Sequence, residues 1–263
     1  RRQRQMCIRD SSMETVLSNV GNAAFNDPFY GWIDNEQIYF ADRNTGIRRI
    51  GVNERNLALS TSDAKYDYFV QNNRLEYYGN PWQYGAMNAC FAKADGLWYW
   101  GKTYGGGGIF RFAESDISPV DISRGTNPPY ATIFPDEFVK SFVIDATNQI
   151  LYAVIRDKGL YAVPLTDITT NDATKTNTKA ESKYLVASFK SDSEGSVGEY
   201  VDVCQMVLDS TDGSVYFGLR AEEGSSETSG VKRWNPTTKK LETIVSGVNV
   251  YGIALNNELS NLF

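Results

Sequence analysis

The sequence contains no histidine and only three cysteines among its 263 residues. Without histidine, the Ser-His-Asp and Cys-His arrangements of many hydrolases are excluded, and the commonest transition-metal ligand is missing. Cys7, Cys90 and Cys204 are too few and too widely spaced for a disulfide framework or a zinc site. Cys90 and Cys204 each lie in an apolar run, so we expect both to be buried free thiols. Any catalysis would depend on carboxylates, lysine, tyrosine or a carboxylate-bound metal.

The chain also lacks an excess of basic residues and any long apolar run. Its formal net charge is −6 and its pI is near 4.9, which argues against non-specific binding of nucleic acid. No stretch approaches the ~20 apolar residues that a membrane-spanning helix needs. We therefore predict no nucleic-acid partner and no membrane span in this chain.

The first twelve residues, RRQRQMCIRDSS, match nothing later in the chain and lack the apolar segment of a signal peptide. The run QMCIRD resembles the translated sequencing-adaptor tract found at the ends of metagenome-derived gene models. We expect residues 1–12 to be a non-native or disordered tail and residues 13–263 to form the folded domain.

A pattern repeated four times dominates the remaining sequence. It consists of a turn, a short apolar and aromatic run that ends in a basic residue, a loop, and then Gly-apolar-x-basic-aromatic. The four copies are residues 35–50, 95–112, 148–163 and 212–234. In addition, METVLSNV at 13–20 reappears as LETIVSGV at 241–248, 228 residues later, so the mean repeat is about 57 residues. That length suits a module of four antiparallel strands.

Each unit predicts a hairpin of short strands. In the first unit, Phe29–Ile33 and Ile38–Ala41 flank Asp34-Asn35, which are favourable turn residues. The later units predict inner strands at 88–93, 139–144 and 203–208, followed by turns at 95–96, 147–148 and 212–213.

The polar run 169–183 predicts a long exposed loop or an excursion at the outer edge, and 221–229 predicts a solvated hairpin loop. Residues 250–263, VYGIALNNELSNLF, match the inner strand and first turn of a further unit.

These features predict an all-β fold, a β-propeller of four-stranded antiparallel blades. Sheets without helical cover must bury their apolar faces on neighbouring sheets, and radial stacking does so while limiting exposed edges. We expect four full repeats with partial ends, in a propeller that is truncated at the C-terminus.

Two known families resemble parts of the repeat. Residues 96–112, GLWYWGKTYGGGGIFRF, resemble the two-component-regulator propeller repeat, roughly G-x-L-W-x-G-T-x-G-G-G-L-x-R-Y/F. Trp98, Gly101 and the Gly-apolar-x-Arg-Phe ending match it, whereas Tyr99-Trp100 and Lys102 depart from it. The fourth unit is similar to the same repeat, and IYFADR at 38–43 resembles YWTD-type propellers of receptor ectodomains. The first resemblance implies a bacterial, extracytoplasmic (periplasmic or extracellular) sensing or binding role, with no catalytic residue.

Four basic residues occupy one position of the repeat, each four residues after an aromatic: Arg43, Lys102, Arg156 and Arg220. Because an even spacing places two side chains on one face of a strand, the four are expected on one rim, near a mouth of the central channel. Such a partial ring could attract a carboxylate, sulfate or phosphate. Alternatively, each pairs with a neighbouring acid such as Asp42, Asp157 or Glu222.

Aromatic residues crowd the connection 66–84, which includes Trp82 and Tyr84, and Tyr104 lies in the glycine-rich loop of the second unit. Amphipathic aromatic surfaces on loops suit sugars, peptides or flat ligands. Trp82, Tyr84 and Tyr104 therefore join the basic residues as ligand-binding candidates. Alternatively, this connection supplies an outer strand and caps the core between blades.

No catalytic residue, metal site or cofactor is assigned. The carboxylates of Asp209 and Asp212 flank a tight turn and are expected to accept hydrogen bonds from its backbone. The leading hypothesis is a non-enzymatic, ligand-binding or sensory propeller for a small molecule, glycan or peptide. A metal-dependent propeller enzyme of lactonase or lyase type and a protein-interaction scaffold are the alternatives.

Overall fold

The regular structure of this protein is almost entirely β-strand. The computed structural model describes residues 17–19, 28–42, 46–54, 57–59, 67–71, 91–102, 108–113, 131–135, 137–155, 158–168, 177–188, 202–220 and 229–255. These residues include two single 3₁₀ turns, Leu165–Asp167 and Ser182–Tyr184, and no α-helix. None of their helices is long and apolar enough to cross a membrane. The all-β prediction is confirmed.

Four antiparallel sheets follow one another along the chain, and each is built from strands in sequence order. The first contains β2 (Pro28–Asp34), β3 (Gln37–Asp42), β4 (Gly46–Gly51) and β6 (Asp67–Gln71). The second contains β7 (Phe91–Ala94), β8 (Leu97–Lys102), β9 (Gly108–Ala113) and β10 (Ala131–Ile133). The third contains β11 (Val139–Asp145), β12 (Ile150–Ile155), β13 (Gly159–Pro164) and β15 (Leu185–Ser188). The fourth contains β16 (Asp202–Leu208), β17 (Val215–Arg220), β18 (Gly230–Asn235) and β19 (Lys240–Ser246).

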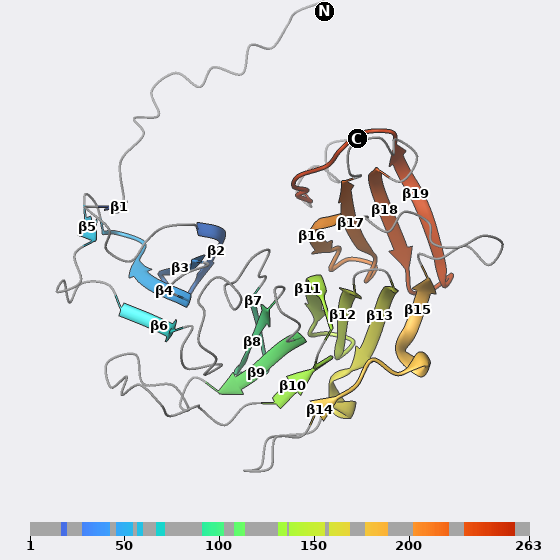
Figure 1. The fold of residues 1–263 in the computed structure, drawn as a ribbon, viewed down its shortest axis with the longest axis horizontal. Helices are drawn as coiled ribbons and strands as arrows, with labels where there is room; N and C mark the ends of the chain where they lie inside the picture. Colours follow the sequence, from blue (N-terminus) through green and yellow to red (C-terminus); the bar gives the residue numbers. More distant parts are fainter. Residues whose placement is uncertain are drawn as a thin grey trace, which may run out of the picture.

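The sheets are arranged as a four-bladed β-propeller (Figure 1). They follow one another around a common centre, with β7, β11 and β16 on the inside and β15 and β19 on the outside. The inner strands β11 and β16 of consecutive sheets pack against each other. The predicted propeller of four-stranded antiparallel blades is confirmed.

Two short pairings lie outside this pattern. β14 (Asn177–Thr178) pairs in parallel with β10 and adds a fifth strand to the outer edge of the second sheet. This strand lies in the polar run that we predicted to be a loop or an outer-edge excursion. β1 (Leu17–Asn19) pairs in parallel with β5 (Leu57–Leu59). The similar sequence at 241–248 forms β19, an antiparallel outer strand, so the two copies of this motif have different partners.

The hairpin turns follow from local sequence. Asn35 and Glu36 have φ of 47° and 59°, and Asp95 and Gly96 have 53° and 76°. Two consecutive residues with positive φ make the tight turn that matches the twist of paired strands, and Asn, Asp and Gly tolerate that geometry. Asp34 ends β2, so the first turn lies one residue later than predicted.

A β-bulge recurs at the start of the inner strand. The pairing of the first and second strands shifts between Pro28 and Tyr30, between Val139 and Ser141, and between Val203 and Gln205. An extra residue at this point bends the strand and redirects its side chain. The three sheets whose inner strand is described up to this point therefore share the same irregularity at the same place.

The core consists of layers between neighbouring sheets. Tyr99 of β8 packs in one cluster with Leu151, Ala153 and Ile155 of β12, and Tyr152 packs in another with Val215, Phe217 and Leu219 of β17. Because alternate residues of β12 enter different clusters, the third sheet is buried on both faces, which explains its nearly continuous apolar sequence. Between the first two sheets, the Trp98 ring lies 4.8 Å from that of Tyr39. Burying each large aromatic side chain contributes about 1.5–3 kcal/mol.

Steric constraints explain why the third strand of a unit begins with glycine. Gly159 and Gly230 have φ of 142° and 140°, a region essentially closed to other residues. A Cβ on Gly159 would lie 2.1 Å from the carbonyl oxygen of Ala187, and one on Gly230 would lie 1.9 Å from that of Val245. The backbone of the fourth strand therefore occupies the space that a side chain would need.

Candidate functional site

The structure describes two of the seven predicted ligand-binding residues. Arg220 ends β17 and Lys102 ends β8. The other five, Arg43, Trp82, Tyr84, Tyr104 and Arg156, lie outside the described residues. The ligand-binding role of all seven stays a prediction.

The strand register corrects the position of Lys102 within the repeat. Lys102 pairs with Gly108, the glycine that opens the third strand, whereas Gly230 pairs with Leu219. Lys102 is thus the equivalent of Leu219, and Arg220 comes one residue later. Lys102 follows Trp98 by four residues, and Arg220 follows Tyr216 by four residues. Tyr216 is the equivalent of Tyr99, however, so the two spacings start from different positions of the repeat.

Arg220 lies against an exposed aromatic ring at the end of the fourth sheet. Its guanidinium carbon is 5.6 Å from the centre of the Tyr251 ring, a cation–π geometry. Tyr251 is 70% exposed, whereas Arg220 is half-buried. The exposed ring and the guanidinium therefore lie side by side, a combination that suits a ligand with both a flat apolar surface and an anionic group.

Two hydrogen bonds donated by backbone amides hold Tyr251 in this place. The amide of Val250 donates to the carbonyl of Leu219 at 3.2 Å, and the amide of Ile253 donates to Oε1 of Gln205, also at 3.2 Å. Residues 249–255 therefore lie on the fourth sheet without forming a strand of their own. The sequence did not single out Tyr251, because it lies in a run that was assigned to an inner strand.

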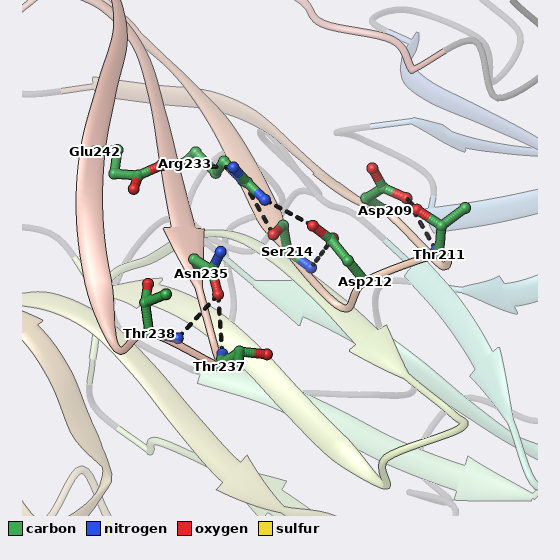
Figure 2. Close-up of polar contacts among 9 residues, drawn as sticks. All are labelled: Asp209, Thr211, Asp212, Ser214, Arg233, Asn235, Thr237, Thr238 and Glu242. Atoms are coloured by element: carbon green, nitrogen blue, oxygen red, sulfur yellow. Dashed lines mark hydrogen bonds and ion pairs between the residues drawn. The ribbon is translucent and has the colours of Figure 1, made fainter. Parts of the chain in front are cut away.

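A second polar cluster lies at the other end of the same sheet, around Arg233 of β18 (Figure 2). Arg233 Nη2 donates to the Asp212 carboxylate at 2.6 Å, and its Nε donates to Ser214 Oγ at 3.0 Å. Glu242 lies 3.5 Å away on β19. The guanidinium charge is matched within the sheet, so this cluster stabilises the turn between β16 and β17.

The turn carboxylates behave as the sequence predicted. Asp209 accepts from the Thr211 amide at 2.9 Å, and Asp212 accepts from the Ser214 amide at 2.8 Å. Partial burial alone would raise the pKa of Asp212, but the hydrogen bonds from Ser214 and Arg233 outweigh it and hold that pKa below its usual value.

The basic residue of the Gly-apolar-x-basic-aromatic pattern has a recurring partner across the sheet. In three sheets, the basic residue of the third strand lies opposite the tyrosine of the second strand: Tyr39 with Arg49, Tyr99 with Arg111, and Tyr216 with Arg233. In the third sheet, Tyr152 lies opposite Ala162. Arg111 is buried and donates to the carbonyl of Ile168, in the segment that follows β13, at 3.1 Å. Here the arginine joins one sheet to the next.

The described residues contain no group of three or more His, Cys, Asp or Glu side chains placed to hold a metal ion. The metal-dependent alternative therefore has no assigned ligand among them.

No family model and no curated protein matches this sequence. Solved structures do match its fold. One is the extracellular domain of a protein assigned as a hybrid two-component system from B. thetaiotaomicron, with a TM-score of 0.51 and 13% identity over 85% of this chain. Another is a protein of unknown function from Bacteroides thetaiotaomicron, with a TM-score of 0.50 and 13% identity over 86%. A third is a protein assigned as a 6-phosphogluconolactonase from Bacteroides uniformis, with a TM-score of 0.50 and 11% identity over 89%.

This chain spans 26%, 45% and 62% of those three chains, respectively. Identities this low show a shared fold and do not transfer an activity. The chain is a four-bladed β-propeller, with repeats that resemble those of two-component regulators and a fold similar to the extracellular domain of a hybrid two-component system.

Proposed function

We propose that this propeller is a non-enzymatic, ligand-binding domain with a sensory role, and that it binds an anionic ligand at the rim where Arg220 lies. The observation that carries the proposal is the contact between half-buried Arg220 and exposed Tyr251. A guanidinium that is fixed against a ring keeps its planar donors oriented, so less conformational entropy is lost when a carboxylate, sulfate or phosphate binds.

The ligand class follows from the chemistry of the pair. The Tyr251 ring offers a flat apolar surface, which suits a sugar or a peptide side chain, and Arg220 offers bidentate donors for a carboxylate. An acidic glycan or an acidic peptide satisfies both. The formal charge of the whole chain is −6, so a local cation is needed to attract such a ligand.

The proposed compartment is extracytoplasmic. Its support is the regulator-type repeats together with the shared fold of an extracellular domain from a protein assigned as a hybrid two-component system. A role in sensing is the part of the proposal that depends most on this likeness.

A thermal-shift screen tests the binding proposal directly. Uronic-acid oligosaccharides, sulfated oligosaccharides and acidic peptides are compared with neutral counterparts of equal size. A ligand at one hundred times its Kd stabilises the folded state by about 2.7 kcal/mol, which is readily detected. We expect acidic ligands to raise the melting temperature and the neutral counterparts to have a smaller effect.

Three variants then locate the site by calorimetry. Arg220→Gln and Tyr251→Ala are each expected to weaken binding about tenfold or more, equal to about 1.4 kcal/mol. Lys232→Gln is the matched control, because this cation lies in the same sheet and donates to Thr243. Equal losses in all three variants, or no stabilisation by any acidic ligand, would contradict the proposal. Lactone hydrolysis that requires a stoichiometric bound metal would favour the enzyme instead.

A further inference from the structure

The outer strand contains a β-bulge in three of the sheets, and in the second sheet it is regular. In the first, third and fourth sheets, the pairing with the outer strand shifts between the second and third residues of the third strand. The extra residues of the outer strands are Phe69, Val186 and Ile244. In the second sheet, Ile109 and Phe110 occupy these two positions and pair with Ile133 and Thr132 without a shift.

The regular outer strand is also the one whose edge is covered. A regular strand at the edge of a sheet presents a continuous row of backbone donors and acceptors to another strand, and a bulge interrupts that row. In the described part of the chain, the bulged strands β6, β15 and β19 end their sheets, whereas β14 pairs beyond β10. Each sheet is therefore protected in one of two ways, by a bulge or by a cover.

The cover is the segment 177–184, which we call the strap. It begins with β14 on the edge of the second sheet and leads directly into β15 of the third sheet (Figure 1). β14 pairs in parallel with Thr132 and Ile133, and the Phe134 amide donates to the Thr178 carbonyl at 2.6 Å. The backbone edge of β10 is thus occupied by a strand of the same chain.

Side chains fasten the strap to the third sheet as well. Ala180 packs against the core between the second and third sheets. The hydroxyl of Tyr184, which is 5% exposed, donates to Oδ2 of Asp167 at 2.9 Å. Asp167 lies in the 3₁₀ turn that follows β13. The strap is therefore attached at one end to the second sheet and at the other to the third.

The strand under the strap is apolar and carries no charge. Ala131 and Ile133 are 1% and 0% exposed, whereas Leu185 of β15 and Ile244 of β19 are 36% and 50% exposed. The sequence Ala-Thr-Ile-Phe at 131–134 combines high β-propensity with zero net charge. If the strap moved away, β10 would expose both an unpaired backbone edge and these apolar residues.

We propose that the strap is an autoinhibitory cover, and that the β10 edge beneath it is a docking surface for the β10 edge of a second copy of this chain. An uncharged edge does not repel its own copy, and two identical strands pair in antiparallel orientation about a two-fold axis. With that axis at Thr132, each Ala131 lies opposite the partner's Ile133. The proposal does not depend on ligand binding.

A charge placed under the strap tests the proposal on the full 263-residue chain. Ala180→Glu should detach the strap, so the amides of 131–134 should exchange with solvent at least about tenfold faster at low protein concentration. At high concentration, light scattering should show a doubled mass. Lys179→Glu is the matched control, because it introduces the same carboxylate at the exposed neighbouring position and should leave a monomer.

The dependence on concentration identifies the surface that pairs. Dimerisation through β10 should restore the protection of the 131–134 amides. A peptide with the sequence of residues 175–184, KTNTKAESKY, should compete for the edge and return Ala180→Glu to a monomer. The same peptide with Asn177→Pro and Thr178→Pro should have no effect, because proline lacks the backbone donor.

Tyr184→Phe is a milder variant that removes only the hydrogen bond to Asp167. It should speed the exchange of the Phe134 amide by about threefold. Unchanged exchange of this amide would overturn the proposal, and it decides the matter if Ala180→Glu does not fold. An Ala180→Glu protein that keeps the 131–134 amides protected as a monomer, or exposes them and stays monomeric, would also overturn it. So would a dimer in which these amides remain exposed, since that dimer would use another surface.

Discussion

Asp212 illustrates how single residues maintain the turns of this fold. Its carboxylate accepts from the Ser214 amide and from Arg233 at the same time. Ser214 lies in the turn before β17 and Arg233 lies on β18, so the side chain links this turn to β18. Polar residues in turns of this kind are satisfied locally, which is why their role was predictable from the sequence.

Replacement of Asp212 by Asn should remove the charge interaction and keep the acceptor for the Ser214 amide. We expect a loss of about 0.5–1 kcal/mol in the free energy of unfolding at pH 7, since the pair is largely solvated. The folded pKa is lowered, so this stability is present above the unfolded value of about 4 and is lost as pH falls through the folded pKa. Urea midpoints for both proteins should therefore differ at pH 7 and converge in strong acid.

Glu181→Gln is a suitable control for this experiment. Its ion pair with Lys183 is longer, at 3.4 Å, and both side chains are mostly exposed. We expect a smaller shift of the urea midpoint than that of Asp212→Asn, because an exposed pair contributes little to stability. A difference for Asp212→Asn that grows as pH falls would contradict the assigned direction of the pKa shift.

In the candidate site, the place of Arg220 at the end of a strand was predictable, and its contact with Tyr251 was not. Arg220 ends β17 four residues after Tyr216, whereas the same spacing in the second unit leads to Lys102, which the register places one residue earlier in the repeat. Tyr251 contacts Arg220 because the preceding residue, Val250, is hydrogen-bonded to Leu219 of β17, the strand that Arg220 ends. A contact between two units depends on how the sheets stack, and spacing within one unit does not contain that information.

At the level of elements, most strands and turns follow from local sequence. Alternating apolar residues and turn residues located the hairpins to within a residue or so, as in β2 and β3. The register of β8 was harder to predict from the sequence, because Trp98, Tyr99 and Trp100 are consecutive aromatic residues and each fits the aromatic position of the repeat. The two-residue turn at Asp95-Gly96 and the pairing of Tyr99 with Arg111 fix that register in three dimensions.

The glycine that opens the third strand leads to a prediction about how closely the third and fourth strands pack. Gly230→Ala should cost at least about 2 kcal/mol of unfolding free energy, because Gly230 has φ of 140° and lies against the Val245 carbonyl. Gly96→Ala is the control, because this glycine also has positive φ but a Cβ there would meet no atom within 4 Å. Its cost should be about 1 kcal/mol.

Urea denaturation of the two variants and the parent checks this comparison. The difference between the two losses in unfolding free energy measures the cost of the close approach of the fourth strand, separately from the cost of positive φ. Equal losses would show that β19 can move away from β18 without cost, in contradiction to the proposed reason for the glycine.

At the level of the whole molecule, the propeller was predictable because the repeat leaves few other solutions. Four similar units with apolar strands and no helices must cover one another, and the four sheets do so. The parallel strand β14 was not predictable, since Asn177–Thr178 has a polar sequence with no strand pattern. Its place depends on the free edge of a sheet that is distant in the sequence.

The layers of buried tyrosine give a pH prediction for the whole molecule. Burial is the largest influence on Tyr99, Tyr152 and Tyr161 and raises the pKa of each hydroxyl above its usual value near 10. Their contribution to stability is complete below about pH 10 and is lost as pH rises through the raised folded values.

We therefore expect the urea midpoint to fall steeply above about pH 10, together with a delayed rise in tyrosinate absorbance. Tyr99→Phe should reduce this dependence at alkaline pH. A midpoint that stays constant to about pH 11.5, or tyrosines that all ionise near their usual pKa of about 10, would contradict the role of burial.

The parallel pairing of β14 with β10 has a consequence for synthesis. Residues 177–178 follow β13 of the third sheet, yet they complete the outer edge of the second sheet, where the Phe134 amide donates to the Thr178 carbonyl at 2.6 Å. While the chain emerges from the ribosome, the second sheet keeps an open edge until the first three strands of the third sheet have been made. An open edge is a template for pairing with other chains, so aggregation during expression should be most sensitive to this interval.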